Sequence, residues 1–158
     1  MPYESALLLI FSTLGSTILL VLVLIERKTA RLMFNQNEVI DEHLIRQTYH
    51  ILKQLVGTIP QLFGVSILGV LITSIIQAIN NRGSLESLLI PAVYFALIFY
   101  NIVPGKSAQV VKSLKATTAE DNLETIKRVL RDVMLQHHIG LAANITVLVL
   151  ELVFFVGF

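Results

Sequence analysis

Residues 139–158 read IGLAANITVLVLELVFFVGF, and this stretch decides the fold. Twenty helical residues at about 1.5 Å each cover roughly 30 Å, the apolar thickness of a bilayer. The strongly polar side chains in it are Asn144 and Glu151. The stretch is too long and too evenly apolar for an amphipathic surface helix, so it predicts a helix that crosses a membrane.

A polar stripe runs down this predicted helix and the turn before it. His137, Asn144 and Glu151 are spaced seven apart, with Gly140 and Ala143 beside them. Two helical turns return a residue to nearly the same face, so the three side chains lie in one line. Polar groups at membrane depth normally face protein or a water-filled cavity. The stripe therefore predicts which side of the helix packs against partner helices.

The composition places the whole chain in the membrane class. Of 158 residues, 54% are hydrophobic and 15% are charged, where a soluble domain has about a quarter charged. The mean hydropathy is +0.74. A net charge of +1 gives no indication of nucleic-acid binding. The chain has no cysteine, which excludes disulfides, thiol catalysis and cysteine-based metal sites.

Four apolar stretches, 5–25, 55–79, 87–103 and 139–158, predict an all-α, four-transmembrane-helix bundle in a single domain. Two polar, partly helical segments, residues 26–54 and 104–138, follow the first and the third of these stretches. The chain starts with an acidic Met-Pro-Tyr-Glu-Ser and a long apolar run. A cleavable signal peptide would have a basic start and a shorter run, so we expect the first helix to be retained.

The distribution of Lys and Arg predicts the orientation. Arg82 stands alone on one side of the predicted membrane. The other eleven fall in the two polar segments: Arg27, Lys28, Arg31, Arg46, Lys53, Lys106, Lys112, Lys115, Lys127, Arg128 and Arg131. The positive-inside rule places both segments in the cytoplasm. Both termini are then expected on the non-cytoplasmic side.

The histidines are the first candidate site. His50 precedes the second span and His137 the fourth, so their imidazoles would face each other if those helices are neighbours. Facing histidines in a bundle can hold a haem or a first-row metal such as copper. His138, with Met134 one turn before it, extends the candidate metal set. The alternative is that these interfacial histidines only make caps and hydrogen bonds and bind no cofactor.

Polar residues within the spans are the second candidate site: Asn144, Glu151, Gln61, Asn101 and Tyr94. A buried glutamate can relay protons or coordinate a cation. The alternative is that these side chains hydrogen-bond between helices and hold the bundle together.

The second half of the chain resembles the transmembrane protein 205-like four-helix proteins, related to copper-resistance D-like membrane domains. The resemblance rests on Pro104 after the third span and on His137 standing seven residues before Asn144. Ile59-Pro60 matches the family's aromatic-Pro motif only in the proline, because Ile replaces the aromatic residue. The similarity covers about the last third and implies four helices, with links to metal or drug resistance.

The sequence carries none of the common catalytic signatures, such as Gly-Xaa-Ser-Xaa-Gly or a phosphate-binding glycine loop. We therefore expect a non-enzymatic accessory subunit of a larger membrane protein complex. Its partners would be the lipid bilayer and other membrane subunits, with no nucleic acid. The alternatives are a small haem- or metal-binding redox or resistance protein and, as a third class, an ion or proton transport component.

Overall fold

The structure is a computed structural model that describes residues 2–35, 37–102, 106–118 and 120–156, without the side chains of residues 100–102 and 156. Within these residues all regular secondary structure is helical, which confirms the all-α prediction. The elements are α1 (Tyr3–Glu26), η1 (Ala30–Met33), α2 (Glu42–Leu55), α3 (Ile59–Asn80), α4 (Leu85–Ile102), α5 (Lys106–Ala116), α6 (Leu123–Glu151) and η2 (Leu152–Val156).

Three helical stretches are long and apolar enough to cross a membrane: Tyr3–Glu26, Ile59–Asn80 and Leu123–Phe155. Helix α4 contributes a shorter apolar segment, Leu85–Phe99, and contains Pro91. The chain thus has the long apolar helices of a membrane protein.

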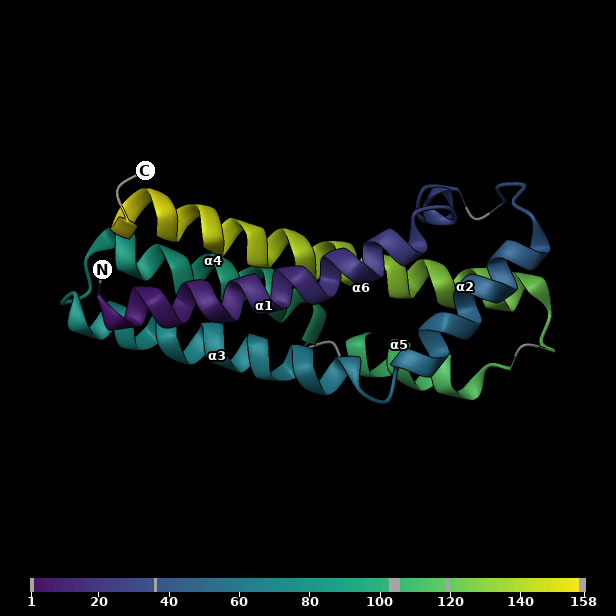
Figure 1. Ribbon diagram of the computed structural model, residues 1–158, viewed down its shortest axis with the longest axis horizontal. Coiled ribbons are helices and arrows are strands. Elements are labelled where there is room, and N and C mark those ends of the chain that lie inside the picture. Colours follow the sequence, from purple (N-terminus) through teal and green to yellow (C-terminus); the bar gives the residue numbers. More distant parts are fainter. Residues whose placement is uncertain (1, 36, 103–105, 119, 157–158) are drawn as a thin grey trace.

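The helices form an elongated molecule with two parts (Figure 1). At the end where both termini lie, α1, α3, α4 and the C-terminal half of α6 run side by side. At the other end, α2 and α5 surround the N-terminal half of α6. Helix α6 contacts α1, α4, α5 and α2, so it is the element that joins the two parts.

Each part has its own apolar core. The core of the terminal bundle comprises Leu8, Val70, Ile90, Tyr94, Ile98, Ala143 and Val147. The core of the other part includes Leu22, Leu32, Ile45, Tyr49, Leu52, Leu114, Ile126, Leu130 and Met134. The polar segments of the sequence are therefore packed against α6 by buried side chains.

Two predicted span boundaries can be compared with the helices. The predicted start of the fourth span, residue 139, lies within α6, which runs without a break from Leu123 to Glu151. The predicted start of the second span, residue 55, is the last residue of α2, and α3 begins at Ile59. Pro60 explains the division between α2 and α3, because proline lacks an N–H and suits the first turn of a helix.

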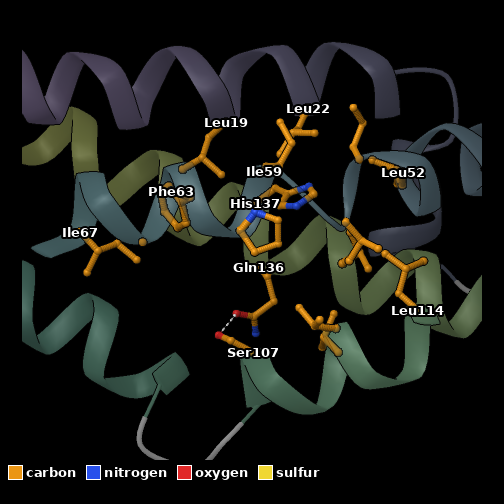
Figure 2. A pocket seen from close by; sticks show the side chains of 17 residues that line it. Leu19, Leu22, Leu52, Ile59, Phe63, Ile67, Ser107, Leu114, Gln136 and His137 are labelled. Atoms are coloured by element: carbon orange, nitrogen blue, oxygen red, sulfur yellow. Dashed lines mark hydrogen bonds between the residues drawn. The ribbon is translucent and has the colours of Figure 1, made fainter. Parts of the chain in front are cut away.

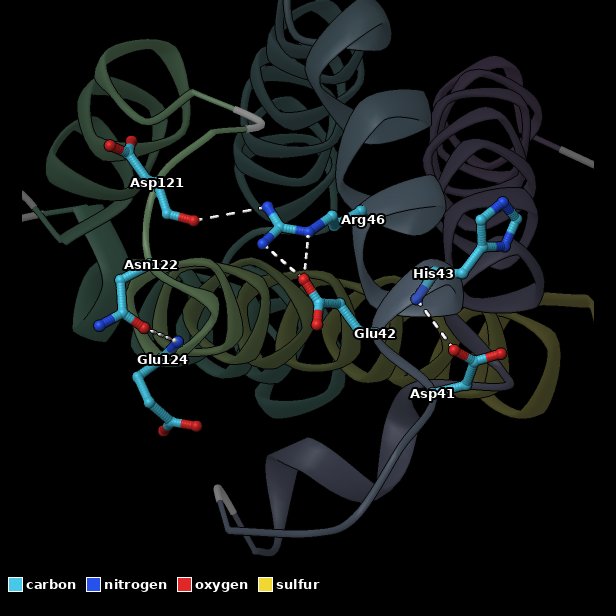
Figure 3. A network of polar contacts seen from close by, with 7 residues as sticks. All are labelled: Asp41, Glu42, His43, Arg46, Asp121, Asn122 and Glu124. Atoms are coloured by element: carbon cyan, nitrogen blue, oxygen red, sulfur yellow. Dashed lines mark hydrogen bonds and ion pairs between the residues drawn. The ribbon is translucent and has the colours of Figure 1, made fainter.

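Side chains fix where α2 and α6 begin (Figure 3). The Asp41 carboxylate accepts a hydrogen bond from the backbone N–H of His43 at 3.0 Å. The Asn122 side chain accepts one from the backbone N–H of Glu124, also at 3.0 Å. These N-caps satisfy N–H groups that the first helical turn leaves without intrahelical partners.

Arg46 then ties the two helix starts together. Its guanidinium lies 2.7 Å from Glu42 Oε1, one turn earlier in α2. The same group donates to the backbone carbonyl of Asp121, just before α6, at 3.4 Å. The polar end of the molecule is thus stabilised by a contact between residues that are far apart in the sequence.

Candidate functional site

A histidine and a glutamate join α6 to α1. The side chain of Glu26, the last residue of α1, is fully buried. Its Oε1 lies 2.6 Å from Nδ1 of His137, whose side chain is 19% exposed. The second carboxylate oxygen, Oε2, has no hydrogen-bond partner among the described residues. The seven-residue stripe in the sequence identified His137. It did not identify the partner Glu26, because Glu26 stands beside Arg27 and Lys28 and looks like part of the polar end of a span.

His137 also lines a cavity of about 260 Å³. Helices α1, α2, α3, α5 and α6 all contribute to its walls, so it lies where the two parts of the molecule meet (Figure 2). Most of the lining is apolar and includes Leu19, Leu22, Leu52, Ile59, Phe63 and Leu114. The sequence did not reveal this cavity, because its walls come from five separate helices.

Polar side chains enter the cavity from α5 and α6. They are Ser107, Gln136 and His137. The Ser107 hydroxyl donates to Gln136 Oε1 at 3.0 Å (Figure 2). A mainly apolar cavity with a few polar groups on one side is typical of small-molecule sites.

Two glycines beside the cavity have opposite surroundings. Gly64 lines it, and a Cβ placed on Gly64 would meet no atom within 4 Å. A Cβ on Gly140 would lie 3.0 Å from Leu19 Cδ1 and 3.2 Å from Phe63 Cζ. Gly140 therefore permits close packing of α6, whereas Gly64 leaves space open.

Asn144 lies inside the terminal bundle as the stripe predicts. It is fully buried, and its Nδ2 donates to the carbonyl of Gly140 at 2.9 Å. A Cβ on Gly15 of α1 would lie 2.7 Å from Asn144 Oδ1 and would also collide with Ser66 Oγ of α3. Three helices thus approach one another closely at this level.

Glu151 is also fully buried and is held by Gln77 of α3. Gln77 Nε2 lies 2.9 Å and 3.1 Å from the two carboxylate oxygens of Glu151. The same nitrogen lies 3.2 Å from the hydroxyl of Ser5 in α1. The arrangement links three helices by hydrogen bonds in an apolar interior.

Of the other polar candidates within the spans, Tyr94 belongs to the same interior. It is fully buried in the core of the terminal bundle, which also contains Ala143, the residue before Asn144. Gln61 is exposed near the start of α3. The side chain of Asn101 lies outside the described residues, as does Pro104.

The two other candidate histidines, His138 and His50, take local partners. His138 Nδ1 lies 2.8 Å from the carbonyl of Met134, one turn earlier. His50 is exposed, and its Nε2 lies 2.9 Å from Gln54 Nε2. The Met134 sulfur lies 3.9 Å from the hydroxyl of Thr29. Within the described part of the chain, no three His, Asp or Glu side chains gather as a metal site requires.

Comparisons of this chain with protein-family models, with curated proteins and with solved structures find no match. The fold and the cavity are therefore the observations from which a function can be inferred.

Proposed function

We propose that this chain is a non-enzymatic integral membrane protein that binds an apolar or amphipathic molecule in the cavity beside His137. The observation that carries the proposal is the mainly apolar cavity of about 260 Å³ with polar groups on one side. Ligand sites have this composition because apolar contacts supply affinity and a few polar groups fix orientation. The absence of catalytic sequence signatures supports binding rather than chemistry.

We further propose four spans, with α4 as the third in chain order. The 18 residues of α4 cover about 27 Å, close to the apolar thickness of a bilayer. Helix α4 also contacts both α3 and α6, two of the long apolar helices. Both termini then lie on the non-cytoplasmic side, because eleven of the twelve basic residues belong to the opposite end.

In this arrangement the cavity lies at the cytoplasmic border of the bilayer. Its walls include Leu22 near the end of α1 and Ile59 at the start of α3. Helices α2 and α5, outside the four spans, and the part of α6 around His137 supply the other walls. A molecule with an apolar body and a polar end would match this position, since apolar and aqueous surroundings meet there.

The binding proposal is tested by filling the cavity. Gly64→Leu places a side chain where a Cβ meets no neighbour, so the fold should persist while the cavity is occupied. Gly57→Leu is the matched control, because its Cβ also meets nothing within 4 Å but Gly57 does not line the cavity. An apolar fluorescent probe should bind the unchanged chain and Gly57→Leu, and bind Gly64→Leu at least tenfold more weakly. Equal binding by all three proteins would overturn the proposal.

The accessory-subunit hypothesis remains the second candidate, favoured by an aromatic pair on α4. Phe95 and Phe99 are about half exposed, and their ring centroids lie 4.9 Å apart. Aromatic residues are enriched at protein interfaces, so a partner helix could cover this pair. If the chain purifies in mild detergent as a large complex, and Phe95→Ala breaks up that complex, the result would support a subunit role. A Soret band in the absorption spectrum of the same sample would support the haem alternative.

A further inference from the structure

We propose that the occupant of the cavity is an anionic membrane phospholipid, with part of one acyl chain inside and the headgroup beside α5. This inference rests on the proposed binding function and adds the class of ligand. Its basis is the combination of an apolar lining, a polar side and a cationic wall helix.

The apolar lining fits a hydrocarbon chain. Among the described residues that line the cavity, only His137 belongs to the ionisable types. The lining is otherwise mostly Leu, Ile, Val, Phe and Pro. Its volume of about 260 Å³ is slightly below the usual range of roughly 300–1,000 Å³ for drug-sized ligands. The cavity therefore suits a segment of one chain, with the rest of the lipid outside.

The wall helix α5 supplies positive charge. Its sequence, KSAQVVKSLKA, contains three lysines and no acidic residue. One side of α5 lines the cavity with Ser107, Val110, Val111 and Leu114, while Lys112 and Lys115 are exposed. Lysines near a membrane surface attract anionic headgroups by roughly 1 kcal/mol each. The lysines would attract the phosphate group of a lipid held close to α5.

Hydrogen-bonding groups stand on the cavity-lining side of α5 and on the adjoining part of α6. The Ser107 hydroxyl, the Gln136 amide and the His137 imidazole all belong to the cavity wall. Glu26, the acid paired with His137, does not line the cavity. The polar groups facing the occupant are thus an amide, a hydroxyl and an imidazole rather than a carboxylate, which suits an anionic headgroup.

The test uses the full chain in nanodiscs of equal parts phosphatidylglycerol and phosphatidylcholine, released into native mass spectrometry. The unchanged chain and Gly57→Leu should each retain one phosphatidylglycerol. Gly64→Leu should retain none, because the acyl-chain space is filled. Replacing Lys112 and Lys115 together by Gln should lower the preference for phosphatidylglycerol by roughly fivefold per lysine. A parallel sample receives oleate, to separate a phospholipid from a free fatty acid.

The outcomes separate the two proposals. Equal retention of both phospholipids, lost in Gly64→Leu, would overturn the anionic preference and leave the binding proposal standing. Displacement of phospholipid by equimolar oleate would assign the cavity to a free fatty acid and overturn this inference. Identical retention by Gly64→Leu and the unchanged chain, together with unchanged probe binding, would overturn both.

Discussion

His137 Nδ1 and Glu26 Oε1 lie 2.6 Å apart and join the middle of α6 to the last residue of α1. His137 is also part of the cavity wall. A fully buried carboxylate is costly unless hydrogen bonds compensate it. This pair is therefore expected to contribute to stability and to the shape of the cavity.

His137→Ala should destabilise the protein by about 3 kcal/mol, because it leaves a buried carboxylate without its partner. This value is the lower end of the usual range, since His137 is partly exposed. Thermal unfolding in mild detergent measures the effect. His138→Ala is the control, because that ring bonds only within its own helix, and it should unfold close to the unchanged chain. Equal unfolding temperatures for both variants would contradict a stabilising role for the pair.

Gln77→Leu should lower the free energy of unfolding by more than the loss of one neutral hydrogen bond would. It removes the amide that lies within 3.1 Å of both Glu151 oxygens and leaves that carboxyl group in an apolar interior. The expected cost is roughly 1–3 kcal/mol or more. The double variant Gln77→Leu/Glu151→Leu should recover part of it, because both polar partners are then gone. Additive losses in a double-mutant cycle would show that the two side chains do not interact.

Gly15→Ala tests the close approach of three helices. The new Cβ would lie 2.7 Å from Asn144 Oδ1 and would also collide with Ser66 Oγ. Overpacking of this kind typically costs about 1–3 kcal/mol. Gly57→Ala meets no atom within 4 Å and serves as the control. If both alanine variants unfold at the temperature of the unchanged chain, the helices are not as closely packed here as the structure places them.

The sequence was most informative along single helices. Seven-residue spacing identified His137, Asn144 and Glu151 as one stripe, and the structure places the latter two in the interior. Spacing along one helix does not reveal which residue lies opposite on another. Glu26 is 111 residues from His137, and Gln77 is 74 residues from Glu151. Local patterns contain no information on such pairings.

The division between α2 and α3 had a local signal that hydropathy concealed. Residues around Leu55 are apolar enough to be read as the start of a span, but Pro60 favours a new helix beginning near Ile59. The cavity had no comparable signal, because it depends on how five helices pack. A glycine such as Gly64 does not identify a cavity wall, because glycine in a helix equally suits close packing.

The proposed orientation can be measured by introducing single cysteines, since the chain contains none. Lys112→Cys lies on α5 in the lysine-rich part, and Glu86→Cys lies in the first turn of α4. Both positions are exposed, so neither change should disturb the fold. In sealed cells, a membrane-impermeant maleimide should label Glu86→Cys and leave Lys112→Cys unlabelled until the membrane is permeabilised. The reverse pattern would place the cavity on the outer side. Labelling of both before permeabilisation would mean that α4 does not cross the bilayer, because α4 separates the two positions.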